Sequence, residues 1–187
     1  MPRTYTKVLR AAAEEETRRR IVEALIELHA EVGPARTTVS AVAERAGVER
    51  LTVYRHFPDE LSMFRACSSL YMQRNPPPAP VHNDDPLVAV RKTLAAVYAW
   101  YRSNEAMFTN VLKDVERMPS LRESTAGLLA YVDAAASALD RLFDERRAQR
   151  KATLHHALEF HTWQSLSRLT RSDRAAAELA MSWVLAS

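Results

Sequence analysis

The run NPPPAPVHNDDP at residues 75–86 constrains the fold of this 187-residue chain more than any other feature. Consecutive prolines lack backbone donors and favour an extended path, so no helix is expected to pass through this stretch. On both sides of it, apolar residues recur at the three- and four-residue steps of amphipathic helices. The sequence therefore predicts two helical units that are separated by an extended linker.

Composition supports helices on both sides of the linker. The chain holds only three glycines and is 47 % hydrophobic, with abundant Ala, Leu, Arg and Glu. This balance favours helix over strand, so we predict an all-α fold with about nine helices. The single cysteine, Cys67, excludes an internal disulfide. Because the sequence also shows no secretory signal and no membrane span, we expect a cytoplasmic protein.

Ahead of the linker, the residues follow the pattern of a helix-turn-helix. Gly33-Pro34 ends a first amphipathic helix, and Thr38 is suited to the N-cap of a short second helix. Ala46-Gly47-Val48 then turns the chain, because glycine accepts a backbone conformation that side chains resist. A third short helix follows, and Asp59 is suited to cap a fourth.

The third helix has an outward face that is polar, cationic and aromatic. Val48, Val53 and Phe57 can point inward, which leaves the other side to arginine, leucine and tyrosine. Such a face suits the major groove of double-stranded DNA, because arginine can bind guanine and leucine can contact a thymine methyl. Helix starts and hydroxyl groups can donate to phosphates. The candidate DNA-binding residues are Thr38, Arg50, Leu51, Tyr54, Arg55 and His56.

The segment GPARTTVSAVAERAGVERLTVYRHFPDELSMF, residues 33–64, resembles the DNA-binding domain of the TetR family of transcriptional regulators. The resemblance lies in the Thr-Thr-Val start, the Ala-Gly-Val turn, Thr52-Val53-Tyr54 and His56-Phe57. It implies that Thr38, Arg50, Tyr54 and His56 touch DNA. It also implies a second, helical domain that pairs two subunits and often encloses a small-molecule pocket.

Two positions depart from the family pattern. Glu49 stands where the family often has a capping serine, and glutamate is a poorer N-cap. It can remain solvated or accept from a cytosine amino group. Glu60 stands where many members carry a lysine near the phosphates. Both changes add negative charge close to the expected DNA face, on a chain whose formal net charge is only +3.

On this basis we divide the chain into four parts. Residues 1–13 form a flexible N-terminal arm, and residues 14–75 a DNA-binding domain whose helix-turn-helix spans about 37–57. Residues 76–86 are the Pro-rich linker. Residues 87–187 form a helical domain for effector binding and dimerisation.

The second domain offers two sets of candidate residues. Large aromatic residues with polar tips suit an apolar effector pocket, although such residues at helical spacing also form ordinary cores. The effector candidates are Trp100, Met107, Phe108, Tyr131, His161 and Trp163. A stripe of mainly apolar residues can form half of a four-helix dimer interface or close the chain's own core. The interface candidates are Leu154, Leu158, Thr162, Ser165, Leu169, Leu179 and Trp183.

The sequence does not favour a metal site, a cofactor or an enzyme. His155 and Glu159 are four residues apart, but His156 and His161 are five apart and diverge around a helix. A structural or surface role is therefore favoured over metal binding for these residues. No nucleophile–base motif, phosphate-binding glycine loop or dinucleotide fingerprint is present.

The leading hypothesis is a cytoplasmic, homodimeric transcriptional regulator that binds an inverted-repeat operator in double-stranded DNA. As a repressor, it would be released by a small apolar or aromatic effector. One alternative is a helical dimeric scaffold for protein partners that does not bind DNA. Another is a ligand-independent regulator whose second domain has a filled core.

Overall fold

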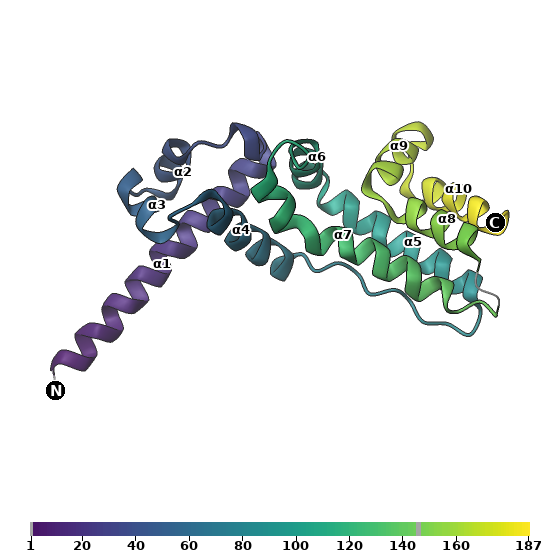
Figure 1. Cartoon of the computed structure of the whole chain (residues 1–187), viewed down its shortest axis with the longest axis horizontal. Helices are drawn as coiled ribbons and strands as arrows, with labels where there is room; N and C mark the ends of the chain where they lie inside the picture. Colours follow the sequence, from purple (N-terminus) through teal and green to yellow (C-terminus); the bar gives the residue numbers. More distant parts are fainter. Residues whose placement is uncertain (1, 145–146) are drawn as a thin grey trace. The chain divides into compact units, whose positions relative to one another are not determined.

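The structure is a computed structural model that describes residues 2–144 and 147–187. Within these ranges it contains ten α-helices, one short 3-10 helix and no strand, which confirms the all-α prediction (Figure 1). The elements are α1 (Pro2–Glu31), η1 (Pro34–Arg36), α2 (Val39–Ala46), α3 (Arg50–His56), α4 (Glu60–Arg74), α5 (Pro86–Ser103), α6 (Glu105–Asp114), α7 (Pro119–Asp140), α8 (Ala148–Leu158), α9 (Phe160–Thr170) and α10 (Asp173–Leu185).

The chain forms two compact units, and neither is continuous in sequence. The first unit holds the N-terminal stretch through Arg74 together with Thr109–Thr125. The second unit holds Asn75–Phe108 and Ala126–Ser187. This division differs from the linear one expected from the sequence, because part of α6 and the start of α7 belong with the first unit.

Hydrogen bonds explain why the later segment belongs to the first unit. The Asn110 side-chain amide donates to the Ala30 carbonyl at the end of α1, at 2.8 Å. The Asp114 carboxylate accepts from the Ala35 N–H at 3.0 Å. Both bonds satisfy backbone groups at a helix end, where intrahelical partners are missing.

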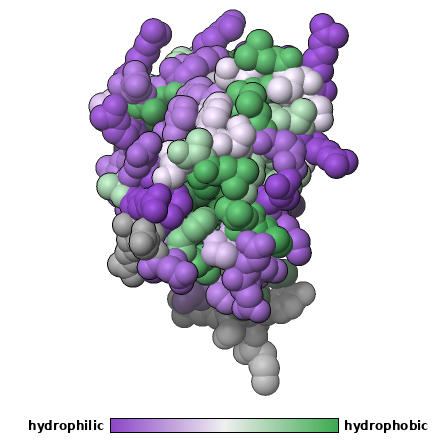
Figure 2. Space-filling view, turned by 90° about the vertical axis from the view of Figure 1, so that its right-hand side faces the viewer, coloured by the Kyte–Doolittle hydropathy of each residue, from purple (hydrophilic) through white to green (hydrophobic). Residues whose placement is uncertain are grey.

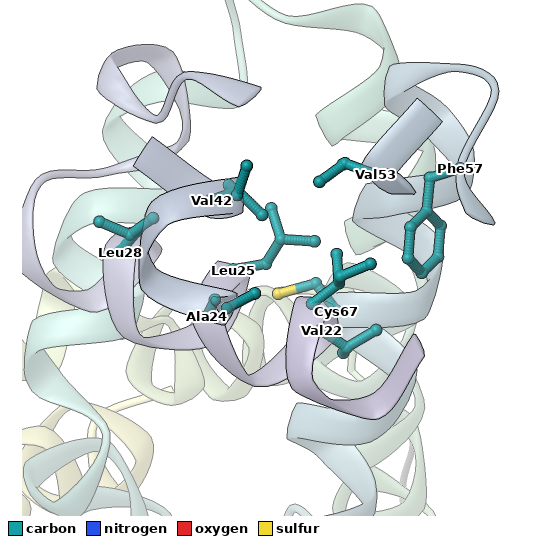
Figure 3. Close-up of a cluster of buried hydrophobic side chains, with 11 residues drawn as sticks. Val22, Ala24, Leu25, Leu28, Val42, Val53, Phe57 and Cys67 are labelled. Carbon is teal, nitrogen blue, oxygen red and sulfur yellow. The ribbon is translucent and has the colours of Figure 1, made fainter. Parts of the chain in front are cut away.

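The first unit has a core made by α1, α2, α3 and α4 (Figure 3). Leu25 and Leu28 of α1 pack with Val42 of α2, and Val53 of α3 closes the cluster. Each such buried aliphatic side chain stabilises the fold by about 1.5–3 kcal/mol relative to an exposed one. This cluster holds α2 and α3 against α1 and so fixes the helix-turn-helix.

The first helix is longer than expected. It begins at Pro2, so residues 2–13, which were predicted to form a flexible arm, are helical. Alanines at 11–13 and glutamates at 14–16 are strong helix formers. Once the buried part of α1 is docked, the helix can extend through them at low cost. Residues 7–16 are exposed, and this part of the helix is thus held by propensity rather than packing.

The extra helix of the second unit comes from a break at Glu159. This residue ends α8 and begins α9, with an extended backbone at φ −70° and ψ 143°. The break leaves carbonyls at the end of α8 without helical partners. The hydroxyls of Tyr98 and Tyr101 in α5 donate to Ala157 O at 2.8 Å and Leu158 O at 2.7 Å. Burial raises the pKa of both phenols, so they stay protonated donors.

The linker prediction agrees with the local backbone. Residues 76–83 are not helical, and α5 begins at Pro86 behind the cap of Asp85, whose carboxylate accepts from Leu87 N at 2.8 Å. A membrane-spanning helix must be long and nearly free of charge. None of the helices in the described ranges meets that requirement.

Candidate nucleic-acid interface

The start of α2 is built around Thr38. Its backbone is extended (φ −101°, ψ 151°), and its hydroxyl oxygen accepts from the Ala41 N–H at 3.1 Å. This confirms the predicted N-cap. The oxygen is used to start the helix, but the hydroxyl hydrogen can still be donated outward. Because Thr38 is exposed, it can present this hydrogen and the first N–H groups of α2 to an anion.

The turn between α2 and α3 depends on Gly47. This glycine lies in the left-handed region (φ 63°, ψ 44°), and Val48 N then donates back to Ala43 O at 2.9 Å. Such a helix end favours glycine, because a side chain is strained at positive φ. Arg20 of α1 donates to Ala46 O at 3.0 Å through Nε and to Gly47 O at 2.9 Å through Nη2. The turn is therefore fastened to α1 by a charged group.

The α3 helix is anchored by two residues that have no exposed surface, Val53 and Phe57. The guanidinium of Arg18 lies 4.2 Å from the centre of the Phe57 ring and donates to His56 O at 3.1 Å. Cation–π contact and hydrogen bond together hold the end of α3 against α1. The predicted inward face is thus confirmed.

The opposite face of α3 is exposed, as the periodicity indicated. Leu51 is 71 % and Tyr54 is 45 % exposed, and Arg50 and Arg55 are exposed as well. His56 is only half-buried, and its ring tilts against Phe57 with the ring centres 6.5 Å apart. The structure thus places five of the six candidate DNA-binding residues on the surface of α3 or at the start of α2.

Both departures from the family pattern take the expected local form. Glu49 is the N-cap of α3 and makes no capping hydrogen bond with its side chain. Asp59 precedes α4, and its carboxylate accepts from Ser62 N at 2.7 Å. Glu60 follows as the first residue of α4 and is exposed. The side chain at position 60 is therefore free to face a partner.

Sequence reasoning missed the arginines that support this surface. Arg18 and Arg20 hold α3 and the turn, whereas Arg19 pairs with Glu16 and Glu23 on the exposed side of α1. The signal was present as three consecutive arginines at 18–20. Only the apolar positions of α1 were used for the prediction, so the supporting role of the two inward arginines was not found.

In the second unit, the aromatic effector candidates meet in one cluster. Trp100, Phe108, Tyr131 and Trp163 are joined by two residues that sequence reasoning missed, Tyr101 and Phe160. Neighbouring rings in this cluster have centres 4.9–5.8 Å apart. Met107 is also buried, whereas His161 is exposed. The cluster is a continuous packed body of rings, and His161 lies at its edge against Phe160.

The polar tips of these aromatic residues are bonded to the protein itself. Trp100 Nε1 donates to Asn75 O at 3.1 Å, and the Tyr131 hydroxyl donates to Pro78 O at 2.8 Å. Trp163 Nε1 donates to the Asp173 carboxylate at 3.0 Å. A ligand that sought these donors would therefore have to displace existing partners.

The interface candidates do not share one face, which corrects the predicted stripe. Leu154 and Leu158 are fully buried and Thr162 is nearly so, because the break at Glu159 turns the two halves of the stripe apart. These three close the unit's own core. Ser165, Leu169 and Leu179 are exposed, and Trp183 is half-buried against the ring of His156.

Comparison with known proteins places this surface in a family. Residues 21–67 match the sequence profile of bacterial regulatory proteins of the tetR family. The HTH-type transcriptional regulator SrpR of Pseudomonas putida is 41 % identical over 56 residues, which are 30 % of this chain and 26 % of SrpR. The match thus spans about a quarter of the length of that curated relative.

Solved structures share the fold beyond the matched segment. A transcriptional regulator from Rhodococcus sp. Rha1 has a TM-score of 0.66 and 21 % identity, covering 90 % of this chain and 96 % of that one. A Clostridium perfringens protein, provisionally assigned as a fatty acid metabolism regulator, has a TM-score of 0.63 and 19 % identity, covering 89 % and 97 %. At these identities the likeness establishes the fold alone.

The matched segment begins at Ile21 and ends at Cys67. These two residues are also the first and last members of the buried cluster in Figure 3. The match therefore covers the whole core that fixes the helix-turn-helix, including Thr38, the Gly47 turn and α3. On this evidence, residues 21–67 form a helix-turn-helix domain of the tetR family of bacterial regulatory proteins.

Proposed function

We propose that the protein is a homodimeric repressor that binds an inverted-repeat operator with one α3 helix in each major groove. The observation that carries this proposal is the division of α3 into two faces. Val53 and Phe57 are fully buried, whereas Leu51 and Tyr54 are left to solvent. A rigid short helix with an exposed polar and aromatic face is suited to major-groove recognition.

The residues on this surface have different roles in the proposal. Arg50 reads a base, because a guanidinium can make two hydrogen bonds to guanine, and Leu51 contacts a thymine methyl. Thr38 and Tyr54 donate to phosphates and set the position of the helix on the duplex. Arg55 and His56 lie at the end of α3. In the proposed complex they add a positive charge and a hydrogen-bond donor near the DNA backbone.

The proposed dimer uses the exposed face of α9 and α10. Leu169 is 79 % exposed on α9, and Leu179 and Leu185 are exposed on α10. Viewed from the end that carries the C-terminal helices, hydrophobic side chains gather between hydrophilic ones (Figure 2). Exposed apolar side chains that cluster are typical of contact surfaces. A two-fold dimer also matches the symmetry of an inverted repeat.

The proposal also includes the release of DNA when a small apolar effector binds. This part is supported by the family resemblance alone. The aromatic cluster is where such an effector would bind. The polar tips of Trp100, Tyr131 and Trp163 are already hydrogen-bonded within the protein, and this observation favours a second candidate function. That candidate is a regulator of the same kind whose second unit is a filled core and whose DNA binding does not respond to a ligand.

Selection of binding sites from a random DNA library by the full-length protein tests this proposal. The expected product is an inverted repeat whose half-site centres lie about 10 bp apart, or a multiple of that spacing. Arg50→Ala is expected to relax the preference at one or two base pairs, at a cost of about 1–3 kcal/mol. Arg141→Ala, an exposed arginine of the second unit, is the matched control and should select the unchanged sequence.

Enrichment of a single asymmetric half-site by a monomer would contradict the dimeric mode. If no sequence were enriched at all, the protein would be better explained as a helical scaffold that does not bind DNA. A retained preference in Arg50→Ala, with an altered one in Arg141→Ala, would show that α3 is not the reading element.

A further inference from the structure

Glu49, the residue directly before α3, has a fixed backbone and an unused side chain. Its carbonyl accepts from Thr52 N at 2.9 Å and from Val53 N at 3.3 Å, which holds the residue in the first turn of the helix. Its side chain is exposed and makes no capping hydrogen bond. The turn before it is fastened to α1 by Arg20. The carboxylate therefore extends into solvent from a defined position.

Other acids of the first unit are bound by arginines. The pairs are Glu16 and Glu23 with Arg19, and Glu27 and Glu31 with Arg45. The carboxylate of Glu49, in contrast, has no partner among the residues that the structure describes. Arg50 follows it directly, and side chains at neighbouring positions of a helix do not face each other. Glu49 and Arg50 are therefore both available to another molecule.

A carboxylate can distinguish the base edges of the major groove. The side chain of an ionised glutamate only accepts hydrogen bonds. In the major groove, the donors are the amino groups of cytosine and adenine, whereas guanine and thymine present acceptors. Adenine places the acceptor N7 beside its amino group. Because that acceptor repels the second carboxylate oxygen, cytosine is the better partner.

The position of Glu49 suits contact with a base rather than with a phosphate. Recognition helices in the major groove contact base edges with the residues at their N-terminal end. Glu49 and Arg50 are the exposed residues at that end of α3. An acid at a phosphate weakens binding to every sequence alike. An acid at the base edges weakens binding to all sequences except those that offer it an amino group.

We infer that Glu49 is a specificity-determining residue that accepts a hydrogen bond from the amino group of a cytosine. This cytosine lies beside the guanine that Arg50 binds, in each half of the inverted repeat. The inference rests on the proposed function and adds one base to the sequence that each α3 helix recognises. Guanine or thymine at the same position is disfavoured, because their acceptor oxygens repel the carboxylate.

Selection of binding sites from a random DNA library by the full-length protein and two variants tests this inference. The wild-type chain should select cytosine beside the guanine of each half-site. Glu49→Ala should lose the cytosine and keep the guanine. Glu49→Gln should shift the preference toward adenine, since an amide can bond to both the amino group and N7.

Affinities for two defined DNA duplexes make the same test quantitative. One duplex carries the selected site, and the other has thymine in place of the cytosine in one half-site. The wild-type chain should bind the thymine duplex about tenfold more weakly, the size of one good base contact. For Glu49→Ala the two affinities should agree within about twofold. Its unfolding temperature should match the wild type, because no capping hydrogen bond is lost.

The matched control is Glu60→Gln, which removes an exposed acid at the start of α4. It should select the wild-type sequence. Selection of that same sequence by both Glu49 variants, with all DNA bound more tightly, would overturn the inference and leave the proposed function in place. If the wild-type chain enriched no sequence, the inference and the proposed function would both be overturned.

Discussion

The exposed face of α3 and the aromatic cluster of the second unit use similar side chains in opposite ways. On α3, the ring of Tyr54 and the guanidinium of Arg50 are presented to solvent. In the cluster, the hydroxyl of Tyr101 and the indole of Trp163 are bonded inside the unit. Both regions use side chains with hydrogen-bonding groups, but only those on α3 remain available to another molecule.

This difference separates stability from recognition. A buried aromatic group with a satisfied polar tip contributes packing and a hydrogen bond to folding. An exposed group contributes little to folding, since surface substitutions usually change stability by less than about 0.5 kcal/mol. Substitutions in the cluster should therefore alter unfolding, and substitutions on the α3 face should alter DNA binding.

The largest expected effect is that of Trp163→Ala. Trp163 is completely buried against the rings of Tyr101 and Phe160 and the guanidinium of Arg102, so the truncation removes packing and leaves a cavity. The free energy of unfolding should fall by about 3–5 kcal/mol, as measured by urea denaturation. A loss below about 1 kcal/mol, the size expected for a partly exposed site, would show that the cluster is loosely packed and open to a ligand.

A pH series tests a buried polar group that differs from both regions: His29 is 2 % exposed, and its Nε2 has no hydrogen-bond partner among the described residues. Its folded pKa is about 4 and its ordinary value 6.5, so the unfolded chain binds a proton first as the pH falls. Stability should therefore be unaffected above pH 6.5, fall by about 3 kcal/mol between pH 6.5 and 4, and level off below that. His29→Leu should lack this component, and an identical pH dependence in the variant would contradict it.

The sharpest paired test compares two tyrosines. Tyr98→Phe leaves the buried Ala157 carbonyl without its donor and should cost about 1–3 kcal/mol of unfolding free energy. Tyr54→Phe should leave unfolding unchanged and weaken binding to all DNA sequences nearly equally, because a phosphate contact carries no base information. If Tyr54→Phe changed the selected sequence instead, Tyr54 would be a reader and not a positioning residue.

The smallest effect on stability is expected for Glu60→Lys. An acid in the first turn of α4 is favoured by the helix dipole, so its replacement should cost about 0.3–1 kcal/mol in thermal unfolding. Binding to specific and random DNA should both tighten. One added phosphate contact in each of two subunits should steepen the slope of log K against log salt by about 1.8. An unchanged slope would place residue 60 away from the phosphates.

Local features of the fold were accessible from the sequence. The cap at Thr38, the turn at Gly47 and the cap at Asp59 each follow from one residue type at one position. The buried pair Val53 and Phe57 follows from helical spacing. Each of these signals acts over a few residues, so no knowledge of distant contacts was needed.

Features set by distant contacts were not accessible. The break at Glu159 carries no glycine or proline and depends on the hydroxyls of Tyr98 and Tyr101 in another helix. The predicted stripe therefore ran through it, and Leu154 and Leu158 were placed in an interface although they are core. The same limit applies to Arg18 and Arg20, whose partners lie on α3 and its turn.

The discontinuous first unit also bears on how such proteins can be cut and recombined. A fragment that ended at the proline run would contain the complete helix-turn-helix but would lack Asn110 and Asp114. The Ala30 carbonyl and the Ala35 N–H would then be left without these partners. The unit that contains the helix-turn-helix is therefore not a self-contained segment that ends at residue 75. A chimera that transfers this unit has to include residues 109–125 as well, or the acceptor protein has to supply an equivalent segment.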